Sequence, residues 1–313
     1  MLNQISQYIK QTIHDFPDQD SLILNNHLHQ INQTNFHSIS AQAEGKSITF
    51  IDGGQAEILS TGNFCLSFIR VAAITFKDNK KVKYFKNEFY LFTKASYREN
   101  EIYYESKLFT KENPLINETD LFISSNDTTI KNGTERAPIS KSSSMARRFA
   151  ELALAGMIDS DFIILDGTLE KTFSQEEKYL NKLSPKVSAL AKTSSLFTGS
   201  GNSPTILLNK IGPGGAWRYD LNPQTCFVKL HPTSKHVFRF EGNKEILPYL
   251  ISNSADALFL GYPYGLILAD KLARVTNQEK TALTARFLLN KQNNELMGYL
   301  ATNDAHQILD RIG

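Results

Sequence analysis

The pattern of hydrophobic and polar positions predicts a helix at the start of the chain and then a block of strands. Residues 3–16 place three isoleucines and a phenylalanine at helical spacing. Residues 17–45 are rich in Asn, Gln and His with weak periodicity, so we expect loop and short helix there. Residues 47–51 form a β-branched and aromatic run, which predicts a strand that stops at the turn signal Asp52-Gly53-Gly54.

Three longer apolar runs follow, and they predict an antiparallel meander. Short polar turns at residues 77–80 and 98–101 separate the runs. Consecutive strands joined by short turns pair with their neighbours in the sequence. The predicted strands are residues 64–76, 82–92 and 102–109.

The second half of the chain alternates between predicted helices, loops and short strands. Residues 142–158 begin with serine caps and contain good helix formers, so they predict a helix. Residues 161–165 are continuously apolar, as in a strand that is buried on both faces of a sheet. We expect a helix over residues 174–191, broken or restarted at Pro185. The remaining predictions are loops at 111–143 and 199–215, strands at 225–230 and 236–240, and helices at 245–251, 263–274, 278–290 and 304–311.

This order of elements indicates an α/β fold with a mixed central sheet flanked by helices. No stretch has the composition of a linker, so we expect one elaborated domain over residues 1–313. No apolar run approaches the roughly 20 residues that a membrane helix needs. The N-terminus is amphipathic and does not resemble a signal peptide, so we expect a soluble, cytoplasmic protein with no membrane contact.

Composition and charge narrow the functional classes. With 34 Lys and Arg against 32 Asp and Glu, the net charge is +2, which excludes a protein that holds nucleic acid by net charge alone. A localised basic groove remains open, and the lysines of residues 77–86 fit either a solvated turn or a patch for the DNA backbone. Trp217 could stack on a base or face a partner chain. The two cysteines, Cys65 and Cys226, are too few for a disulfide framework or a closed zinc site and are expected to be reduced core thiols.

Two Asp-Gly steps directly follow apolar runs, at Asp52-Gly53 and Asp166-Gly167. A carboxylate at a strand end is held rigidly, and the following glycine lets a substrate approach closely. Each step alone is an ordinary turn dipeptide. If the two strands are neighbours, however, the carboxylates converge, and a divalent metal would relieve their repulsion.

Further charged residues lie near these steps in the sequence. Glu151 lies in the predicted helix over 142–158, and Arg147 and Arg148 precede it by four and three residues on the same face. This pattern fits a surface salt bridge, or a metal ligand with arginines that reach for phosphate. Lys192 is expected directly after a helix, where it would either interact with the helix dipole or bind phosphate.

The order of these motifs resembles the NurA nuclease family. The resemblance covers about residues 47–277, with residues 1–46 as a helical and loop extension and residues 278–313 as C-terminal helices. It rests on Asp52-Gly53, Glu151, Asp166-Gly167, Lys192, and the run Gly261-Tyr262-Pro263 with Asp270-Lys271. The resemblance implies an RNase H-like core and a manganese-dependent DNA nuclease. Members of that family resect DNA ends as homodimers on a hexameric HerA-type translocase.

By this resemblance, Asp52, Glu151 and Asp166 would be the metal-binding carboxylates, and Arg147, Arg148 and Tyr262 would contact DNA. Two Mn²⁺ or Mg²⁺ ions could be held by three or four carboxylates, and together they would activate a water and neutralise the leaving oxygen. Lys192 would then stabilise the charge on the scissile phosphate.

Two points in the ligand set stay open. Many family members carry a histidine where this chain has Asp270, although aspartate is also a hard oxygen ligand. Glu101 and Glu105, on or near the predicted strand over 102–109, are the alternatives to Glu151.

The activity expected from the resemblance is single-strand endonuclease and exonuclease cleavage during 5′-end resection in double-strand break repair. The alternatives are an RNase H-like resolvase that cuts branched DNA, or a catalytically silent scaffold that docks a motor ATPase. The chain itself lacks a P-loop, because the sequence ending in Gly45-Lys46-Ser47 has Ser40 where the loop requires glycine. Any ATPase must therefore be a partner.

Overall fold

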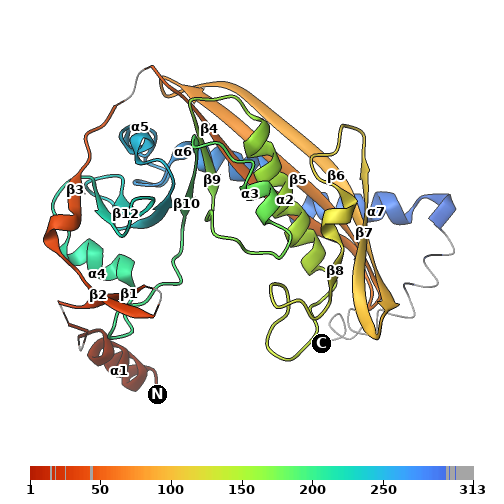
Figure 1. The fold of residues 1–313 in the computed structure, drawn as a ribbon, viewed down its shortest axis with the longest axis horizontal. Helices are drawn as coiled ribbons and strands as arrows, with labels where there is room; N and C mark the ends of the chain where they lie inside the picture. The colour runs from red at the N-terminus through yellow and green to blue at the C-terminus, as the bar shows by residue number, and fades with distance from the viewer. Residues whose placement is uncertain are drawn as a thin grey trace.

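A single large sheet organises the chain. In the computed structural model, which describes residues 1–14, 16–17, 19–24, 26–42, 45–293, 296 and 300, the sheet has eleven strands in the order β3-β11-β12-β13-β10-β9-β4-β5-β6-β7-β8 (Figure 1). The helix predicted over residues 304–311 lies outside the described residues. None of the described helices is long and apolar enough to cross a membrane.

The centre of the sheet confirms the predicted meander and RNase H-like core. Four long strands pair antiparallel in sequence order: β4 (Ser47–Ser60), β5 (Phe64–Lys77), β6 (Lys80–Arg98) and β7 (Glu101–Thr110). On the other side of β4, the short strands β9 (Phe162–Asp166) and β10 (Val187–Ala191) run parallel to it in turn. The order β6-β5-β4-β9-β10, in which only β5 runs against the others, is that of an RNase H-like sheet.

The two tight turns of the meander explain its register. Asp78 and Asn79, between β5 and β6, and Glu99 and Asn100, between β6 and β7, all have positive φ. Two central residues with positive φ match the right-handed twist of paired strands, so these turns set the pairing of the strands that they join.

Short strands extend the sheet at both edges. Beyond β10 lie β13 (Phe238–Glu241), β12 (Thr225–Lys229), β11 (Trp217–Asp220) and β3 (Phe36–Ser38), and β8 (Ile123–Ser124) pairs with β7. A separate hairpin consists of β1 (Ser21–Leu24) and β2 (His27–Gln30).

Helices cover both faces of β4, and two adjacent glycines show how closely they approach. Side chains of successive strand residues point to opposite faces. A Cβ at Gly53 would lie 2.3 Å from Glu151 Oε1 of α2 (Lys141–Met157), and a Cβ at Gly54 would lie 2.2 Å from the Ala273 carbonyl oxygen of α6 (Tyr264–Ala273). The two helices therefore pack on opposite faces of the same point in the sheet (Figure 1).

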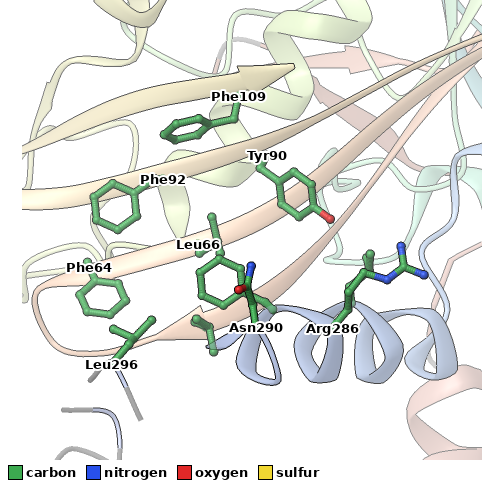
Figure 2. A pocket seen from close by; sticks show the side chains of 11 residues that line it. Phe64, Leu66, Tyr90, Phe92, Phe109, Arg286, Asn290 and Leu296 are labelled. Atoms are coloured by element: carbon green, nitrogen blue, oxygen red, sulfur yellow. The ribbon is translucent and has the colours of Figure 1, made fainter. Parts of the chain in front are cut away.

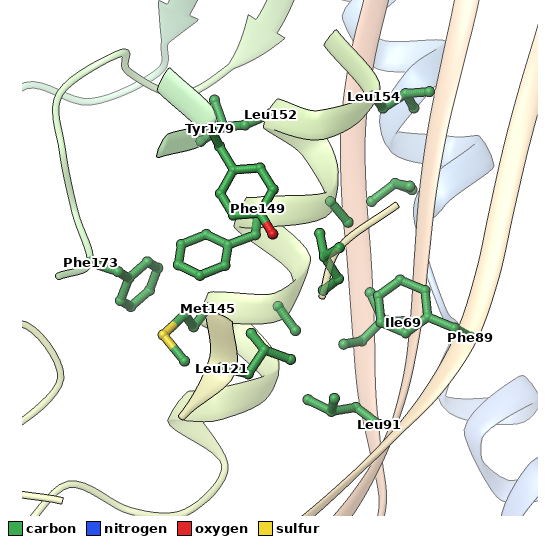
Figure 3. Close-up of a cluster of buried hydrophobic side chains, with 14 of the residues drawn as sticks. Ile69, Phe89, Leu91, Leu121, Met145, Phe149, Leu152, Leu154, Phe173 and Tyr179 are labelled. Atoms are coloured by element: carbon green, nitrogen blue, oxygen red, sulfur yellow. The ribbon is translucent and has the colours of Figure 1, made fainter. Parts of the chain in front are cut away.

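The two faces have separate hydrophobic cores. On the face of α2, one cluster includes Ile69 and Leu91 of β5 and β6 together with buried side chains of α2 (Figure 3). On the side of α2 turned away from these strands, Phe149 stacks on Tyr179 and lies edge-on to Phe173. Under α6, a second cluster joins residues of β4, β9 and β10 to β12 and β13. The remaining helices are α1 (Leu2–His14), α3 (Glu177–Leu180), α4 (Pro204–Ile211), α5 (Leu247–Asn253) and α7 (Asn277–Leu288), with 3-10 turns at Gln33–Asn35, Glu118–Leu121, Lys244–Ile246 and Lys291–Asn293.

Helix α7 lies against the far ends of β4, β5 and β6. Arg70 on β5 bonds Glu279 of α7 at 2.5 Å and Glu88 on β6 at 2.6 Å, which ties the helix to the strands. Between the helix and the strands lies an apolar cavity of about 690 Å³, lined by Phe64, Leu66, Tyr90, Phe92 and Phe287 among others (Figure 2).

Several sequence predictions are wrong. Residues 17–45 hold the strands β1, β2 and β3 as well as loop. The turn predicted at Asp52-Gly53-Gly54 lies in the middle of β4, where the glycines admit the two helices. The helix predicted over residues 174–191 is the short α3 followed by β10, because the buried run of residues 187–191 pairs with β9. The predicted loops also contain short elements, namely a 3-10 turn and β8 within residues 111–143 and α4 within residues 199–215. The sequence pattern does not predict the strand β11.

Other predictions are confirmed. Helices α1, α2, α6 and α7 agree with the expected ranges to within about two residues, and β5, β7 and β9 agree closely. Cys65 and Cys226 are free and buried, as expected of core thiols. Trp217 is 0% exposed, so the predicted contact with a base or partner chain is wrong.

Candidate active site

Two aspartates meet at one point of the sheet. In the parallel pairing of β4 with β9, Ile51 lies opposite Leu165, so the next residue on each strand is an aspartate: Asp52 and Asp166. Asp52 is 8% exposed, and its carboxylate accepts the Gly53 amide hydrogen bond at 2.7 Å. Asp166 ends β9, and Gly167 turns the chain away with φ of +113°. The sheet thus brings together the two Asp-Gly steps that were predicted to converge.

Helix α2 adds Glu151 from above the same strand. Glu151 is 3% exposed, and its Oε1 accepts a hydrogen bond from Arg147 Nη1 at 3.0 Å. Arg147 also donates to the Gly53 carbonyl oxygen at 3.1 Å. Since Gly53 has no side chain, the carboxylate of Glu151 can lie directly over β4 beside Asp52. The pair of Arg147 and Glu151 is the predicted i,i+4 salt bridge, but its carboxylate is buried.

Lys192 reaches the site from the third strand. It is the first residue after β10, and its Nζ lies 2.5 Å from Asp166 Oδ2. Because β9 and β10 are parallel neighbours, their C-terminal ends meet at the same edge of the sheet. The prediction that Lys192 follows a helix is therefore wrong, and its neighbourhood with Asp166 is a consequence of strand pairing.

The carboxylates carry negative charge that the protein only partly neutralises. Burial and the charges of Asp166 and Glu151 together raise the pKa of Asp52 to about 7. Burial also raises the pKa of Glu151, although Arg147 and Arg148 oppose this effect. Burial lowers the pKa of Lys192, but the hydrogen bond to Asp166 and the charges of Asp166, Asp52 and Asp270 together outweigh burial and leave the pKa raised. The site therefore holds its lysine charged and disfavours full ionisation of its acids.

Tyr262 and Asp270 border the site from the side of α6. Tyr262 is buried, and Lys192 Nζ lies 5.3 Å from the centre of its ring. Burial and the charges of Asp166 and Asp52 raise the pKa of Tyr262. Asp270 pairs with Arg274 one turn along α6, and its charge also acts on Lys192 and Tyr262. Both residues thus lie within electrostatic range of the two aspartates.

Of the three remaining candidates, Arg148 lines the cavity beside Glu151 and Asp166, whereas Glu101 and Glu105 lie elsewhere. Arg148 is buried, with its Nε 2.7 Å from the buried Glu176 and its Nη2 2.7 Å from the Thr168 carbonyl oxygen, so it anchors α2 to the loop after β9. Glu101 and Glu105 lie on β7, three strands from β4. Glu101 accepts a hydrogen bond from Asn126, and Glu105 pairs with Arg98 and Lys94. The fold does not bring these two glutamates to Asp52.

Two cavities open on the site and share Lys192. One has a volume of about 420 Å³ and is lined by Arg147, Glu151, Asp166 and Lys192 together with Ser144 and residues 167–168. The other, of about 380 Å³, is lined by Lys192, Tyr262 and Asp270 and by several aromatic side chains. A ligand bound at Lys192 therefore has space on either side.

The comparison with known families gives this arrangement a name. Residues 46–193 match the NurA domain family. The chain carries a NurA domain over these residues, which make up just under half of its length. The matched residues include Asp52, Glu151, Asp166 and Lys192, and they end before Tyr262 and Asp270. The resemblance stated from the sequence is thereby confirmed.

Solved structures and curated proteins complete the comparison. The NurA nuclease from Sulfolobus solfataricus is similar at 13% identity with a TM-score of 0.47, over 92% of this chain and 93% of that chain. Another NurA structure is 8% identical with a TM-score of 0.46, over 84% and 92% of the two chains. Endonuclease V from Ciona intestinalis, bound to DNA containing an inosine, is 12% identical with a TM-score of 0.37, over 87% and 97%. No curated protein sequence matches the chain.

The donor set of the NurA domain suits a hard divalent cation, but its oxygens are engaged by cations of the protein. Within the described residues, no group of three or more His, Cys, Asp or Glu side chains is arranged so that it could hold a metal ion as it stands. Asp166 is held by Lys192, Glu151 by Arg147, and Asp270 outside the matched residues by Arg274. Carboxylate oxygens are the ligands that Mg²⁺ and Mn²⁺ prefer, and both burial and the charges of Asp166 and Glu151 disfavour an ionised Asp52 when no cation is bound. Metal binding would relieve this repulsion and release the ion pairs.

Sequence reasoning missed the residues that support the site. Glu176 is fully buried and orients Arg148, and its carboxylate also accepts the amides of Thr172 and Phe173. A buried acid that binds two backbone amides and an arginine fixes the loop after Asp166. The sequence pattern around Glu176, Gln-Glu-Glu-Lys, looks like an ordinary polar helix, so no local signal distinguishes it.

Proposed function

We propose that this chain belongs to the NurA family and is a metal-dependent DNA nuclease that hydrolyses phosphodiester bonds at Asp52, Glu151 and Asp166. The observation that carries the proposal is the convergence of these three carboxylates from β4, α2 and β9, with Lys192 of the next strand bonded to Asp166. A cluster of buried acids beside a charged lysine supports phosphoryl chemistry, because the reaction needs both metal ligands and a cation for phosphate.

The carboxylates would hold Mn²⁺ or Mg²⁺, and two ions fit a site with this many oxygen donors. When bound, such ions lower the pKa of a water and stabilise the charge on the attacking and leaving oxygens. Asp52 and Asp166, on adjacent parallel strands, would hold their oxygens at a fixed spacing. Asp270 would be a fourth ligand if it left Arg274.

The two basic residues of the site would bind the phosphate. Lys192 Nζ is half exposed at the junction of the two cavities, and it would transfer from Asp166 to a phosphate oxygen when a metal ion takes over the carboxylate. Arg147 lines the same cavity with a third of its side chain exposed, and it could contact the next phosphate along the strand. Both residues act by charge and position, without exchanging a proton.

We further propose that the chain works as a homodimer with a hexameric HerA-type ATPase and resects the 5′ ends of DNA. The apolar stripe of α1 supports a contact with another chain, since Ile5, Ile9 and Ile13 are all exposed. A net charge of +2 gives the chain little general attraction for DNA, so a motor that delivers the strand would compensate.

The deciding experiment incubates the purified chain with labelled single-stranded, blunt duplex and four-way junction DNA, in Mn²⁺, Mg²⁺ or EDTA. We expect metal-dependent cutting of the linear strands, lost in Asp166→Asn and kept in Asp159→Asn, whose carboxylate is fully exposed. Symmetric nicks confined to the junction would favour a resolvase. No cutting under any condition, and no change in melting temperature with metal, would favour a scaffold.

A further inference from the structure

The smaller cavity beside Lys192 has the character of a binding pocket for a flat ring. It has a volume of about 380 Å³, and its polar lining residues include Lys192, Tyr262 and Asp270. His236, Phe238 and Phe259 form its walls. Cavities of this size that combine apolar walls with a few polar groups are typical ligand sites.

The aromatic walls are already arranged around one another. The rings of His236 and Phe259 are stacked, with centres 4.9 Å apart and planes at 23°. Tyr262 packs edge-on to Phe259 at 5.8 Å and against Phe238 at 5.2 Å. These contacts hold the rings in place before a ligand arrives, so little ordering is needed on binding.

Two features of the pocket favour a ligand. The hydroxyl of Tyr262 is buried and makes no well-formed hydrogen bond within the described residues, where the carboxylate of Asp166 is the group that acts on it. Leu258 and Phe259, which form the rim of the pocket, are 63% and 40% exposed. A buried polar group and exposed apolar side chains in one pocket are what a ligand with a polar edge and apolar faces would cover.

We propose that this pocket receives an unpaired nucleobase of the nucleotide next to the phosphate held at Lys192. The inference rests on the proposed nuclease function and adds to it that the strand is engaged single-stranded, with one base stacked on the ring pair of His236 and Phe259. Lys192 links the pocket to the carboxylates, and Tyr262 and Asp270 offer hydrogen-bonding groups to the edge of the base.

A nucleic acid fits better than a protein side chain because the pocket is continuous with the carboxylate site. An apolar partner chain would cover the rim, but it would offer no polar group to the buried Tyr262 hydroxyl. A base within a duplex cannot enter, since its faces are stacked and its pairing edge is occupied. The pocket would therefore select unpaired strands.

The test measures binding in EDTA, where no strand is cut. Fluorescence anisotropy would follow the full-length chain with a labelled single strand and with a blunt duplex. Stacking of one base on an aromatic side chain corresponds to about a 5- to 150-fold change in affinity. We expect Phe259→Ala and His236→Ala to weaken single-strand binding within this range and to leave duplex binding unchanged. The control is Phe109→Ala, an exposed aromatic side chain on β7, which should change neither.

An abasic scan gives the second measurement. For the unmodified chain, a strand that lacks the base bound in the pocket should bind more weakly than the intact strand. For Phe259→Ala, the intact and the abasic strand should bind equally. Two results with Phe259→Ala count against the proposal: unchanged affinity for the single strand, or equal losses of affinity for single strand and duplex. Either result would overturn the proposal that the pocket binds a nucleobase and would favour a protein partner at the rim. An unmodified chain that binds no DNA at all would instead overturn the proposed nuclease function, and this inference with it.

Discussion

At the scale of single residues, the candidate site is defined by charge that the fold concentrates. Burial and two neighbouring carboxylates raise the pKa of Asp52 to about 7, far above its ordinary value. Lys192 pairs with Asp166 and Arg147 pairs with Glu151, whereas no ion pair joins Asp52 to a basic side chain within the described residues. The consequences of this imbalance can be measured one residue at a time.

Replacing Asp52 should affect stability and activity in opposite directions. Because the folded-state pKa of Asp52 is raised, its favourable contribution is complete below pH 3.8 and is lost as the pH rises through about 7. At pH 8 in EDTA, the free energy of unfolding of Asp52→Asn should therefore exceed that of the unmodified chain by up to about 4 kcal/mol. Its melting temperature should be higher accordingly. The difference should shrink towards pH 4.

Thermal melts in EDTA across this pH range, beside nuclease assays in Mn²⁺, would check the prediction for Asp52. Asp159→Asn, at an exposed site, is the control and should show no pH-dependent gain. Cleavage by Asp52→Asn at the rate of the unmodified chain would remove Asp52 from the site.

Replacing Lys192 should slow cleavage without loosening the metal. Its Nζ is placed to bind a phosphate oxygen, and loss of one such contact to developing charge costs about 100- to 1,000-fold in kcat. Lys192→Ala should show this loss with an unchanged Mn²⁺ dependence, whereas Lys186→Ala, on the surface before β10, should behave like the unmodified chain. Parallel losses of rate and Mn²⁺ affinity would mean that Lys192 only holds Asp166 in place.

At the scale of elements, strand β4 organises the site because helices approach it from both faces. Gly53 and Gly54 are adjacent, and the missing side chain of Gly53 makes room for α2 whereas that of Gly54 makes room for α6. Without Gly53 the carboxylate of Glu151 could not lie beside Asp52, and without Gly54 the end of α6 could not lie as close. The two glycines after Asp52 therefore allow α2 and α6 to pack closely on the two faces of the strand.

The two glycines should respond differently to alanine. At Gly54 the new Cβ would meet a backbone carbonyl at 2.2 Å, so α6 must shift, and we expect a loss of about 1–3 kcal/mol in free energy of unfolding. At Gly53 it would meet the flexible ends of Glu151 and Arg147, so the stability loss should be smaller and the loss of activity larger. Denaturant unfolding and cleavage rates would separate the two, with Gly62→Ala as the control because its surroundings are open. Equal effects at both positions would contradict this account.

At the scale of the whole molecule, helix α1 exposes apolar side chains to solvent. Its isoleucines form one apolar stripe, and Figure 1 shows the helix at the periphery, beside the hairpin of β1 and β2 and away from the central sheet. Exposed apolar residues in a row mark contact surfaces in many proteins. The stripe does not pack on the sheet, since Ile5, Ile9 and Ile13 are 47%, 51% and 64% exposed.

Disrupting the stripe should therefore change the oligomeric state. Light scattering at micromolar concentration should show a dimer for the unmodified chain, and a monomer for Ile9→Asp and for a chain that lacks residues 1–16. Gln7→Asp, on an exposed position of the same helix, should remain dimeric. A monomer in every case, with no shift when a HerA-type translocase is added, would refute the proposed assembly.

The sequence alone determined the elements whose signal is local. Helix α2, strands β5 and β7, and the polar turns between the long strands all follow from periodicity and from turn residues within a few positions. It also indicated the acids that lie after apolar runs, Asp52 and Asp166. Such signals act between neighbours in the chain, so they survive without knowledge of the fold.

Only the tertiary structure decided how these elements meet. Residues 187–191 form a strand because β9 and β13 pair with them on either side, and an apolar run of this length does not distinguish a strand from a buried helix. That pairing, in turn, places Lys192 on Asp166 and opens the site towards Tyr262. Asp52 lies within β4 and not at its end, since α2 and α6 fill the space above and below two glycines. Long-range pairing and packing supply these contacts, and residues so far apart in the chain leave no local trace of them.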